Sequence, residues 1–373
     1  MNALQDVIVL GGGPAGAATA ARLAITGIRV ALVERPGPAS VRIGESLPPA
    51  AWARVVALGA AARFLSDRHL ETPGTVACWE TETPAAHDYL YTPPGRGWHL
   101  DRRRFDRMLR KTAVAAGARV IRARPLDIES RSNGFWTLRV RGRDGAMERV
   151  SGRLVVDATG RSSWFARRQG MRRSRLDRLV ALAGLVPTPA TADPRLLVEA
   201  APWGWSYCVP QPSGGLAAVC LMDADDPWRG STLASTWRSR IGSTPHVAAR
   251  AGELAPTCVR LLSAATERLM QFAGHGWLAV GDAAFSRDPL SSGGIAGALE
   301  MASLAAESIG SWFQGSCRAA AEYASALEDQ WSRYLAEQRV QYGAVDRWPT
   351  ELFWLRRRGA MTSRSPAPAS DRR

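Results

Sequence analysis

Three glycines near the start of the chain have the spacing of a phosphate-binding turn. Gly11, Gly13 and Gly16 form the pattern GxGxxG, between an apolar stretch at 6–10 and an alanine-rich stretch at 15–26. In such a unit the first glycine permits a tight turn, the second lets the backbone approach a pyrophosphate, and the third lets the helix pack on the strand. The unpaired N–H groups and the dipole of the helix then favour the negative charge.

An acidic residue stands where this kind of unit binds a ribose. A second apolar stretch covers residues 28–33, and Glu34 follows it at the distance that a ribose-binding acid keeps from the third glycine. The strand, the glycine turn, the helix and the acid together predict a dinucleotide site. A glycine turn with a purely structural role is the alternative.

Four later segments extend the pattern. Gly44 to Pro49 reads GESLPP, Asp101 to Asp106 reads DRRRFD, Asp157 to Arg161 reads DATGR, and Gly281 to Ala284 reads GDAA. With these motifs in this order the chain resembles the para-hydroxybenzoate-hydroxylase-like FAD enzymes, a superfamily of aromatic hydroxylases, flavin-dependent halogenases and geranylgeranyl-reductase-like proteins. The resemblance favours FAD over the plain NAD-dependent dehydrogenase that the glycine motif alone would allow.

The resemblance implies how the chain would hold FAD. Arg102 would contact the ribityl–pyrophosphate region, Asp282 would bond the ribityl chain, and residues 289–294 would place a helix N-terminus beside N1 and C2=O of the flavin. Reduced flavin carries negative charge near N1, which a helix N-terminus stabilises without a titrating side chain. The expected FAD contacts are Gly11, Gly13, Pro14, Ala15, Gly16, Glu34, Arg35, Glu45, Ser46, Arg102, Asp157, Gly160, Gly281, Asp282, Pro289, Ser292, Gly293 and Gly294.

The same resemblance implies a monooxygenase that hydroxylates an electron-rich aromatic or indole substrate through a flavin C4a-hydroperoxide. Because the cofactor supplies the reactive chemistry, the protein mainly excludes water and positions the substrate. NAD(P)H is the expected electron donor, directly or through a separate flavin reductase. His69 and His87 flank the segment expected to face the isoalloxazine, so they are the candidates for an acid or base, and the catalytic residues are otherwise unknown.

Halogenation is disfavoured by the position of the only lysine. Residues 205–210 read WSYCVP, which is similar to the W-x-W-x-I-P segment of the halogenases but differs at two positions. Halogenases also need a lysine at the flavin tunnel, yet no lysine lies between Gly44 and Trp98, and Lys111 falls on a later helix. Arginine is a poor substitute because its pKa is too high to give a neutral nucleophile. A C=C reductase on the same fold and a non-catalytic flavin redox protein remain alternatives.

Two tryptophan-containing segments suggest a narrower resemblance. Residues 74–79 read GTVACW, and residues 347–357 carry Trp348 and Trp354 among arginines. Both look like the compact, halogenase-related flavoproteins, some of which modify a tryptophan in a partner protein while a quinone cofactor matures. Core or interface packing of Trp79 and Trp354 is the alternative. The expected substrate is therefore a small aromatic molecule or a tryptophan in a partner protein.

The elements that must position these residues belong to the α/β class. Helices are expected at 102–116, 294–313 and 319–343, strands at 119–122, 135–141, 147–150, 154–156 and 277–280, and a hairpin between 206–210 and 216–222. The expected domains are a discontinuous FAD-binding Rossmann-like domain (1–70, 98–170 and 263–315), an inserted β-sheet substrate domain (71–97 and 171–262), C-terminal helices (316–360) and a disordered tail (361–373).

The composition fits a globular, cytoplasmic enzyme. Of the 373 residues 46% are hydrophobic and 22% are charged, no stretch is long enough to span a membrane, and the first apolar stretch lacks the features of a signal peptide. The net charge of +14 is spread along the chain, so an anionic cofactor or an acidic protein face is expected, not nucleic acid. Five cysteines and five histidines without ligand spacing predict reduced thiols and no metal site.

Overall fold

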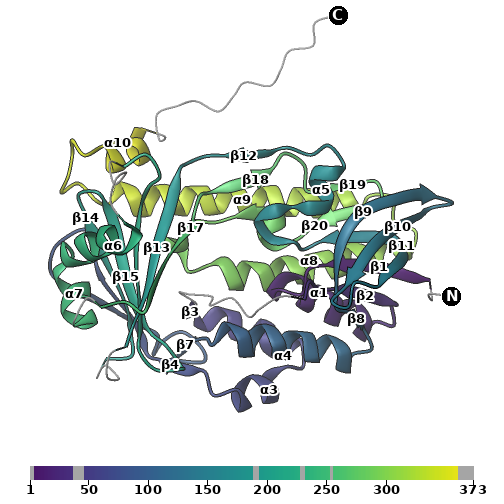
Figure 1. Cartoon of the computed structure of the whole chain (residues 1–373), viewed down its shortest axis with the longest axis horizontal. Coiled ribbons are helices and arrows are strands. Elements are labelled where there is room, and N and C mark those ends of the chain that lie inside the picture. The colour runs from purple at the N-terminus through teal and green to yellow at the C-terminus, as the bar shows by residue number, and fades with distance from the viewer. Residues whose placement is uncertain (1–3, 37–45, 188–192, 227–231, 253–254, 360–373) are drawn as a thin grey trace, which may run out of the picture.

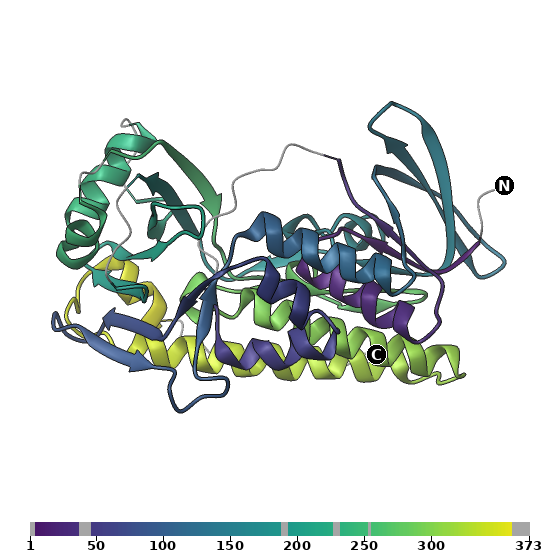
Figure 2. The same cartoon turned by 90° about the horizontal axis from the view of Figure 1, so that it is seen from below.

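The computed structural model describes residues 4–36, 46–187, 193–226, 232–252 and 255–359. They form two halves, each built on one large sheet (Figure 1). The yellow-green helix α9 (Ala319–Gly343) runs along both halves at the lower edge of Figure 2. Within these residues no helix is both long and apolar enough to cross a membrane.

The eight-stranded sheet forms the core of the nucleotide half. Its central strand β1 (Gln5–Leu10) pairs in parallel with β2 (Val30–Val33) and with β11 (Met147–Asp157). The parallel order continues to β8 (Arg119–Ile121) on one side and to β20 (Trp277–Ala279) on the other. Strands in such sheets are covered on both faces, which explains their continuous apolar runs.

β11 is a single strand where the sequence predicts two, at 147–150 and 154–156. Its first part pairs antiparallel with β10 (Phe135–Gly142), its second part pairs in parallel with β1, and Gly152 belongs to both ladders. A Cβ at Gly152 would lie 2.8 Å from Cγ1 of Ile8, so only glycine fits without a shift. The break in the apolar pattern therefore marks a change of neighbours along one strand, not a turn.

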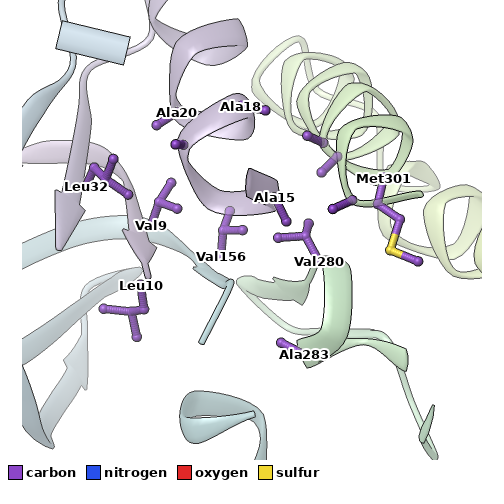
Figure 3. Packing of buried hydrophobic residues seen from close by; sticks show 14 of the residues in the cluster. Val9, Leu10, Ala15, Ala18, Ala20, Leu32, Val156, Val280, Ala283 and Met301 are labelled. Carbon is purple, nitrogen blue, oxygen red and sulfur yellow. The ribbon is translucent and has the colours of Figure 1, made fainter. Parts of the chain in front are cut away.

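Small residues let α1 (Pro14–Ile25) pack closely on two sides. Figure 3 shows its alanines between strand residues such as Val9 and Val156 and the helix α8 (Gly294–Phe313), which carries Met301. Alanine side chains let the helix axes approach closely, and the alanines of α1 belong to the main hydrophobic core. The predicted bounds of α8 and α9 are confirmed.

The second large sheet has seven strands and forms the other half. All neighbouring pairs are antiparallel except β14 with β5. The predicted hairpin is confirmed as β15 and β16. In spatial order the strands are β17 (Cys258–Ser263), β13 (Leu179–Val186), β16 (Leu216–Asp223), β15 (Gly204–Pro210), β14 (Leu196–Ala201), β5 (Gly74–Cys78) and β6 (Ala85–Asp88).

Helices cover parts of both faces of this sheet. On the outer face lie α6 (Leu233–Gly242) and α7 (Pro245–Ala251). On the inner face lie the end of α9 and α10 (Leu352–Gly359), where Trp354 donates from Nε1 to the carbonyl oxygen of Ala201 at 2.9 Å. Trp79 and Trp354 are both buried in this packing. The predicted tail at 361–373 lies outside the described residues, and the positions of the domain boundaries stay predictions.

The remaining elements complete the two halves. The cysteines are all free thiols, and most are buried. There are also two three-stranded sheets. The first contains β3 (Ser46–Leu47), β7 (Gly97–His99) and β4 (Leu70–Thr72). The second contains β12 (Arg173–Arg175), β18 (Glu267–Leu269) and β21 (Phe285–Ser286). The others are α2 (Trp52–Ala57), α3 (Ala61–Ser66), α4 (Arg102–Ala115), α5 (Trp164–Arg168), β9 (Ala123–Ser132) and β19 (Ala273–Gly274).

Candidate cofactor and substrate cavity

A cavity of about 1410 Å³ lies between the two large sheets. One part is lined by the glycine turn, the start of α1, α4 and the segment after β11, and the other part by the inner face of the seven-stranded sheet. Pockets for drug-sized molecules usually have up to about 1,000 Å³. The cavity therefore has room for a dinucleotide and for part of a second molecule.

The three glycines of the turn differ in their surroundings. Gly11 has φ +104°, and a Cβ there would lie 2.3 Å from the carbonyl oxygen of Ala158. A Cβ at Gly16 would lie 1.9 Å from the carbonyl oxygen of Gly11. A Cβ at Gly13 would meet no atom within 4 Å, and Gly13 lines the cavity. The first and third glycines therefore permit close backbone packing, whereas the second leaves open space.

Two helices begin at the cavity without neutralising side chains. α1 follows Gly13 and α8 follows Gly293, and neither residue caps its helix through a side chain. Neither helix has an acidic residue in its first turn. Pro14 and Gly294, the first residues of the two helices, line the cavity. The positive ends of two helix dipoles thus meet one space, which fits the anionic pyrophosphate and the anionic reduced ring of FAD.

Glu34 is held at the end of β2, beside the glycine turn. Its Oε2 accepts a hydrogen bond from the N–H of Gly12 at 2.6 Å. Arg110 on α4 donates to the carbonyl oxygen of Gly12 at 2.9 Å, and its Nη1 lies 3.9 Å from Oε1 of Glu34. The carboxylate therefore has a fixed position at the cavity wall, as a ribose-binding acid requires.

Most of the residues expected to contact FAD gather around this cavity. Gly16, Gly281 and Gly293 lie in the adjoining packing and not in its lining, and Glu45 lies outside the described residues. Those that line it are Gly11, Gly13, Pro14, Ala15, Glu34, Arg35, Ser46, Arg102, Gly160, Asp282, Pro289, Ser292 and Gly294.

Asp157 does not reach the cavity, although the sequence places it among the expected contacts. It is completely buried, and burial raises the pKa of its carboxyl group. Its Oδ2 accepts from the N–H groups of Phe165 at 2.8 Å and Ala166 at 2.9 Å. Its Oδ1 accepts from the N–H and the hydroxyl group of Thr159. Asp157 therefore fixes the turn that carries Gly160 and is a positioning residue.

Neither candidate histidine lines the cavity. His69 packs against Phe64 and Phe105, and its Nδ1 accepts from the N–H of Asp101 at 3.2 Å. Burial lowers the pKa of His69 to about 4, so the ring is neutral near pH 7. His87 is exposed on β6. The structure gives neither ring access to the space where a substrate would lie.

Arg287 and Asp288 line the cavity and are among its wall residues that were not expected from the sequence. The guanidinium of Arg287 lies over the ring of Phe285 at 4.7 Å and occupies the space above Gly297, where a Cβ would be 1.7 Å from its Nη1. Only a glycine one turn into α8 permits this position. The sequence does contain a signal for these two residues. They form a charged pair between two recognised motifs, and a glycine follows in the next helix.

Asp288 is buried in a network of hydrogen bonds that reaches α9. Its Oδ2 accepts from the hydroxyl group of Tyr342 at 2.6 Å, and its Oδ1 accepts from the N–H of Leu290 at 2.9 Å. Trp205 donates from Nε1 to the oxygen of Tyr342 at 3.0 Å. Burial raises the pKa of Asp288 to about 6. The network joins the segment before α8 to the sheet wall and to α9.

The FAD binding domain family matches residues 5–319. The chain belongs to this family. Among its relatives, LodB of Marinomonas mediterranea, named as an FAD-dependent oxidoreductase, is 28% identical over 360 residues, which cover 94% of this chain and 96% of LodB. The flavin-dependent halogenase armH3 of Armillaria mellea is 25% identical over 365 residues, 88% of this chain and 72% of armH3.

Solved structures extend the comparison. The peptidyl tryptophan dihydroxylase QhpG, described as essential for tryptophylquinone cofactor biogenesis, superposes with a TM-score of 0.80 at 26% identity, covering 95% of this chain and 79% of QhpG. The myxobacterial chondrochloren halogenase CndH has a TM-score of 0.84 at 24% identity and covers 95% of this chain and 86% of its own, which shows the shared fold. The protein is an FAD-dependent oxidoreductase.

In this FAD-dependent oxidoreductase, Asp288 makes the stability depend on pH. Its pKa rises from 3.8 to about 6 on folding, so its contribution is fully present below about pH 4 and is lost as the pH rises through 6. The expected loss is about 3 kcal/mol. Chemical denaturation of the FAD-free wild type and of Asp288→Asn between pH 4 and pH 7 measures it, because the free energy of unfolding of the wild type should fall by this amount relative to that of the variant. The comparison cancels the buried His69 and His99, whose lowered pKa values change the stability in the opposite direction in both proteins. An unchanged slope in the variant would contradict the assignment.

Proposed function

We propose that this protein is a monooxygenase that hydroxylates an electron-rich aromatic ring, with the indole ring of a protein-bound tryptophan as its substrate. The observation that carries the proposal is the shape of the cavity, in which the dinucleotide part continues directly into an apolar part. The 26% identity to QhpG over nearly the whole chain supports the choice of a peptidyl tryptophan.

The apolar part is a wall of small, aliphatic and aromatic side chains. It belongs to the inner face of the seven-stranded sheet, where alternate residues of neighbouring strands share one face. A flat apolar wall suits a planar ring and keeps water away from it. Its members are Ala181, Ala183, Leu196, Val198, Trp205, Tyr207, Val219 and Leu262.

FAD, when bound, supplies the redox chemistry and the reaction with O₂. The glycine turn and the start of α1 bind the pyrophosphate, and Glu34 binds the ribose. The start of α8 and the guanidinium of Arg287 lie together at one edge of the cavity. Both favour negative charge there. The sheet wall positions the ring, and Asp288 holds the segment that leads into α8. NAD(P)H supplies the electrons, directly or through a flavin reductase.

Hydroxylation is favoured over halogenation although several relatives are halogenases. The chain has one lysine, Lys111, which lies on α4 near Arg107 and Arg110. The sheet wall therefore carries no amine that could relay an electrophilic halogen species. This difference separates the chain from relatives that it resembles in fold.

Isotope incorporation tests the proposal. The FAD-loaded protein is supplied with NAD(P)H or with a flavin reductase and is incubated with ¹⁸O₂ and a tryptophan-containing peptide. Mass spectrometry then determines the mass of the product. We expect the ring to gain oxygen from ¹⁸O₂. A product that requires halide would indicate a halogenase, turnover without oxygen would indicate a C=C reductase, and an unchanged peptide would contradict an activity on protein-bound tryptophan.

A further inference from the structure

The strand β17 has one bare edge. It is the first strand of the seven-stranded sheet and, among the described residues, pairs only with β13. The N–H of Ala264 donates to the carbonyl oxygen of Leu179 at 3.0 Å. Because the pattern alternates along an antiparallel ladder, the backbone groups of Val259, Leu261 and Ser263 point away from β13.

This bare edge leads into the cavity. Leu262 and Ser263, at the end of β17, line it. Leu262 stands opposite Ala181, a residue of the sheet wall, so both side chains lie on the wall's face. Figure 1 shows β17 next to β13 on the side that faces the nucleotide half. A strand added beside β17 would therefore direct the side chain that lies next to Leu262 into the cavity.

The edge is apolar, which is unusual for an uncovered strand. Leu261 and Leu262 are adjacent, and each is 43% exposed. Natural sheets usually protect a bare edge with charges, proline or a bulge, because it would otherwise pair with another chain. An edge with two exposed leucines is suited to binding an extended chain.

The edge strand carries one exposed basic residue. Arg260, on β17, is exposed and makes no ion pair within the part of the chain that the structure describes. It shares the wall's face, since it stands opposite Ala183. Further exposed basic side chains line the nucleotide part of the same cavity, namely Arg103, Arg107 and Lys111 on one side of α4, and Arg122 and Arg124 after β8. This charge favours an acidic partner.

We propose that β17 is the docking strand for an extended, acidic segment of a partner protein. The segment pairs with the bare edge through its backbone and places an aromatic side chain in the cavity. In this mode of recognition backbone hydrogen bonds provide affinity and alternate side chains provide specificity. The inference rests on the proposed function, because it names how a protein-bound tryptophan reaches the cavity.

The variant Leu261→Pro tests the backbone pairing. Proline removes the outward N–H of this residue and leaves the ladder to β13 intact, as on natural edge strands. Leu261→Ala removes the side chain but keeps the N–H. Ala86→Pro makes the same backbone change on β6, at the other edge of the sheet. The N–H of Tyr89 donates to the carbonyl oxygen of Pro73, so by the alternation of the ladder the N–H of Ala86 also points outward.

The probe is a capped synthetic peptide with a central tryptophan among alternating valines and glutamates. Calorimetry with the FAD-loaded protein should show binding that Leu261→Pro weakens about tenfold. The proline removes one backbone hydrogen bond to the peptide and weakens the neighbouring ones. Leu261→Ala should weaken binding less than Leu261→Pro does, because it keeps the N–H, and Ala86→Pro should bind within about twofold of the wild type. Arg260→Glu, and a peptide with lysines in place of the glutamates, should bind more weakly.

Hydrogen exchange locates the peptide without any substitution in the protein. Bound peptide should protect the amides of 259–263 and leave β6 unchanged, and N-methylation of alternate peptide amides should abolish the protection. Equal binding by Leu261→Pro and the wild type, protection at β6 instead, or a dimer of this chain that buries β17 would each overturn the proposal.

These results separate the docking site from the proposed function. A peptide that protects β17 but gains no oxygen would contradict the proposed hydroxylation and leave the docking strand in place. A peptide hydroxylated equally by the wild type and by Leu261→Pro would contradict the docking strand and leave the hydroxylation in place.

Discussion

The Gly13→Val variant should fold normally and bind FAD about 100-fold more weakly than the wild type. The backbone of Gly13 has φ −73°, which valine adopts readily, and a Cβ there meets no atom within 4 Å. The same position opens on the cavity, where the pyrophosphate must approach the backbone. A side chain in that space would cost about 3 kcal/mol of binding free energy. Fluorescence titration of apoprotein with FAD measures the affinity.

Gly16→Ala is the matched control, because it should act on the fold and not on the cofactor alone. A Cβ at Gly16 would lie 1.9 Å from the carbonyl oxygen of Gly11, so α1 must move away from the turn. We expect a Tm well below that of the wild type even without FAD, whereas Gly13→Val should keep the Tm of the apoprotein. Wild-type FAD affinity in Gly13→Val would mean that the pyrophosphate lies elsewhere.

The Ala181→Phe variant should lower kcat/KM for the aromatic substrate about 100-fold and leave the affinity for FAD unchanged. Ala181 lies on β13 and lines the apolar part of the cavity. A phenyl ring at this position would occupy the space that we assign to the substrate ring, and losing that contact area costs about 3 kcal/mol of transition-state binding. Steady-state oxygen consumption with the peptide or an indole measures kcat/KM.

Ala181→Ser controls for the change of residue, since a serine fits the same volume and should keep most of the activity. The flavin absorbance and Tm of both variants check that the nucleotide half is intact. If Ala181→Phe were as active as the wild type, the ring would have to bind outside the sheet wall, and the division of the cavity into two parts would be wrong.

Much of the nucleotide site could be predicted from the sequence because its geometry is local. The glycine turn, α1 and Glu34 lie within about 30 consecutive residues, the length of one βαβ unit, and each residue acts through its own backbone or its immediate neighbours. The bounds of α8 and α9 were predictable for a similar reason, since a long apolar period fixes a helix. The composition also indicated an anionic partner or cofactor.

The tertiary structure decided what depends on distant contacts. Whether a carboxyl group faces a cofactor or a helix N-terminus depends on how the chain packs around it, so Asp157 proved to be a positioning residue and His69 a core residue. Asp288 acquires its raised pKa only because Tyr342 and the sheet wall bury it. The bare edge of β17 exists only once seven strands from separate parts of the chain have paired. Burial and edges are properties of the assembled sheets, and no local pattern encodes them.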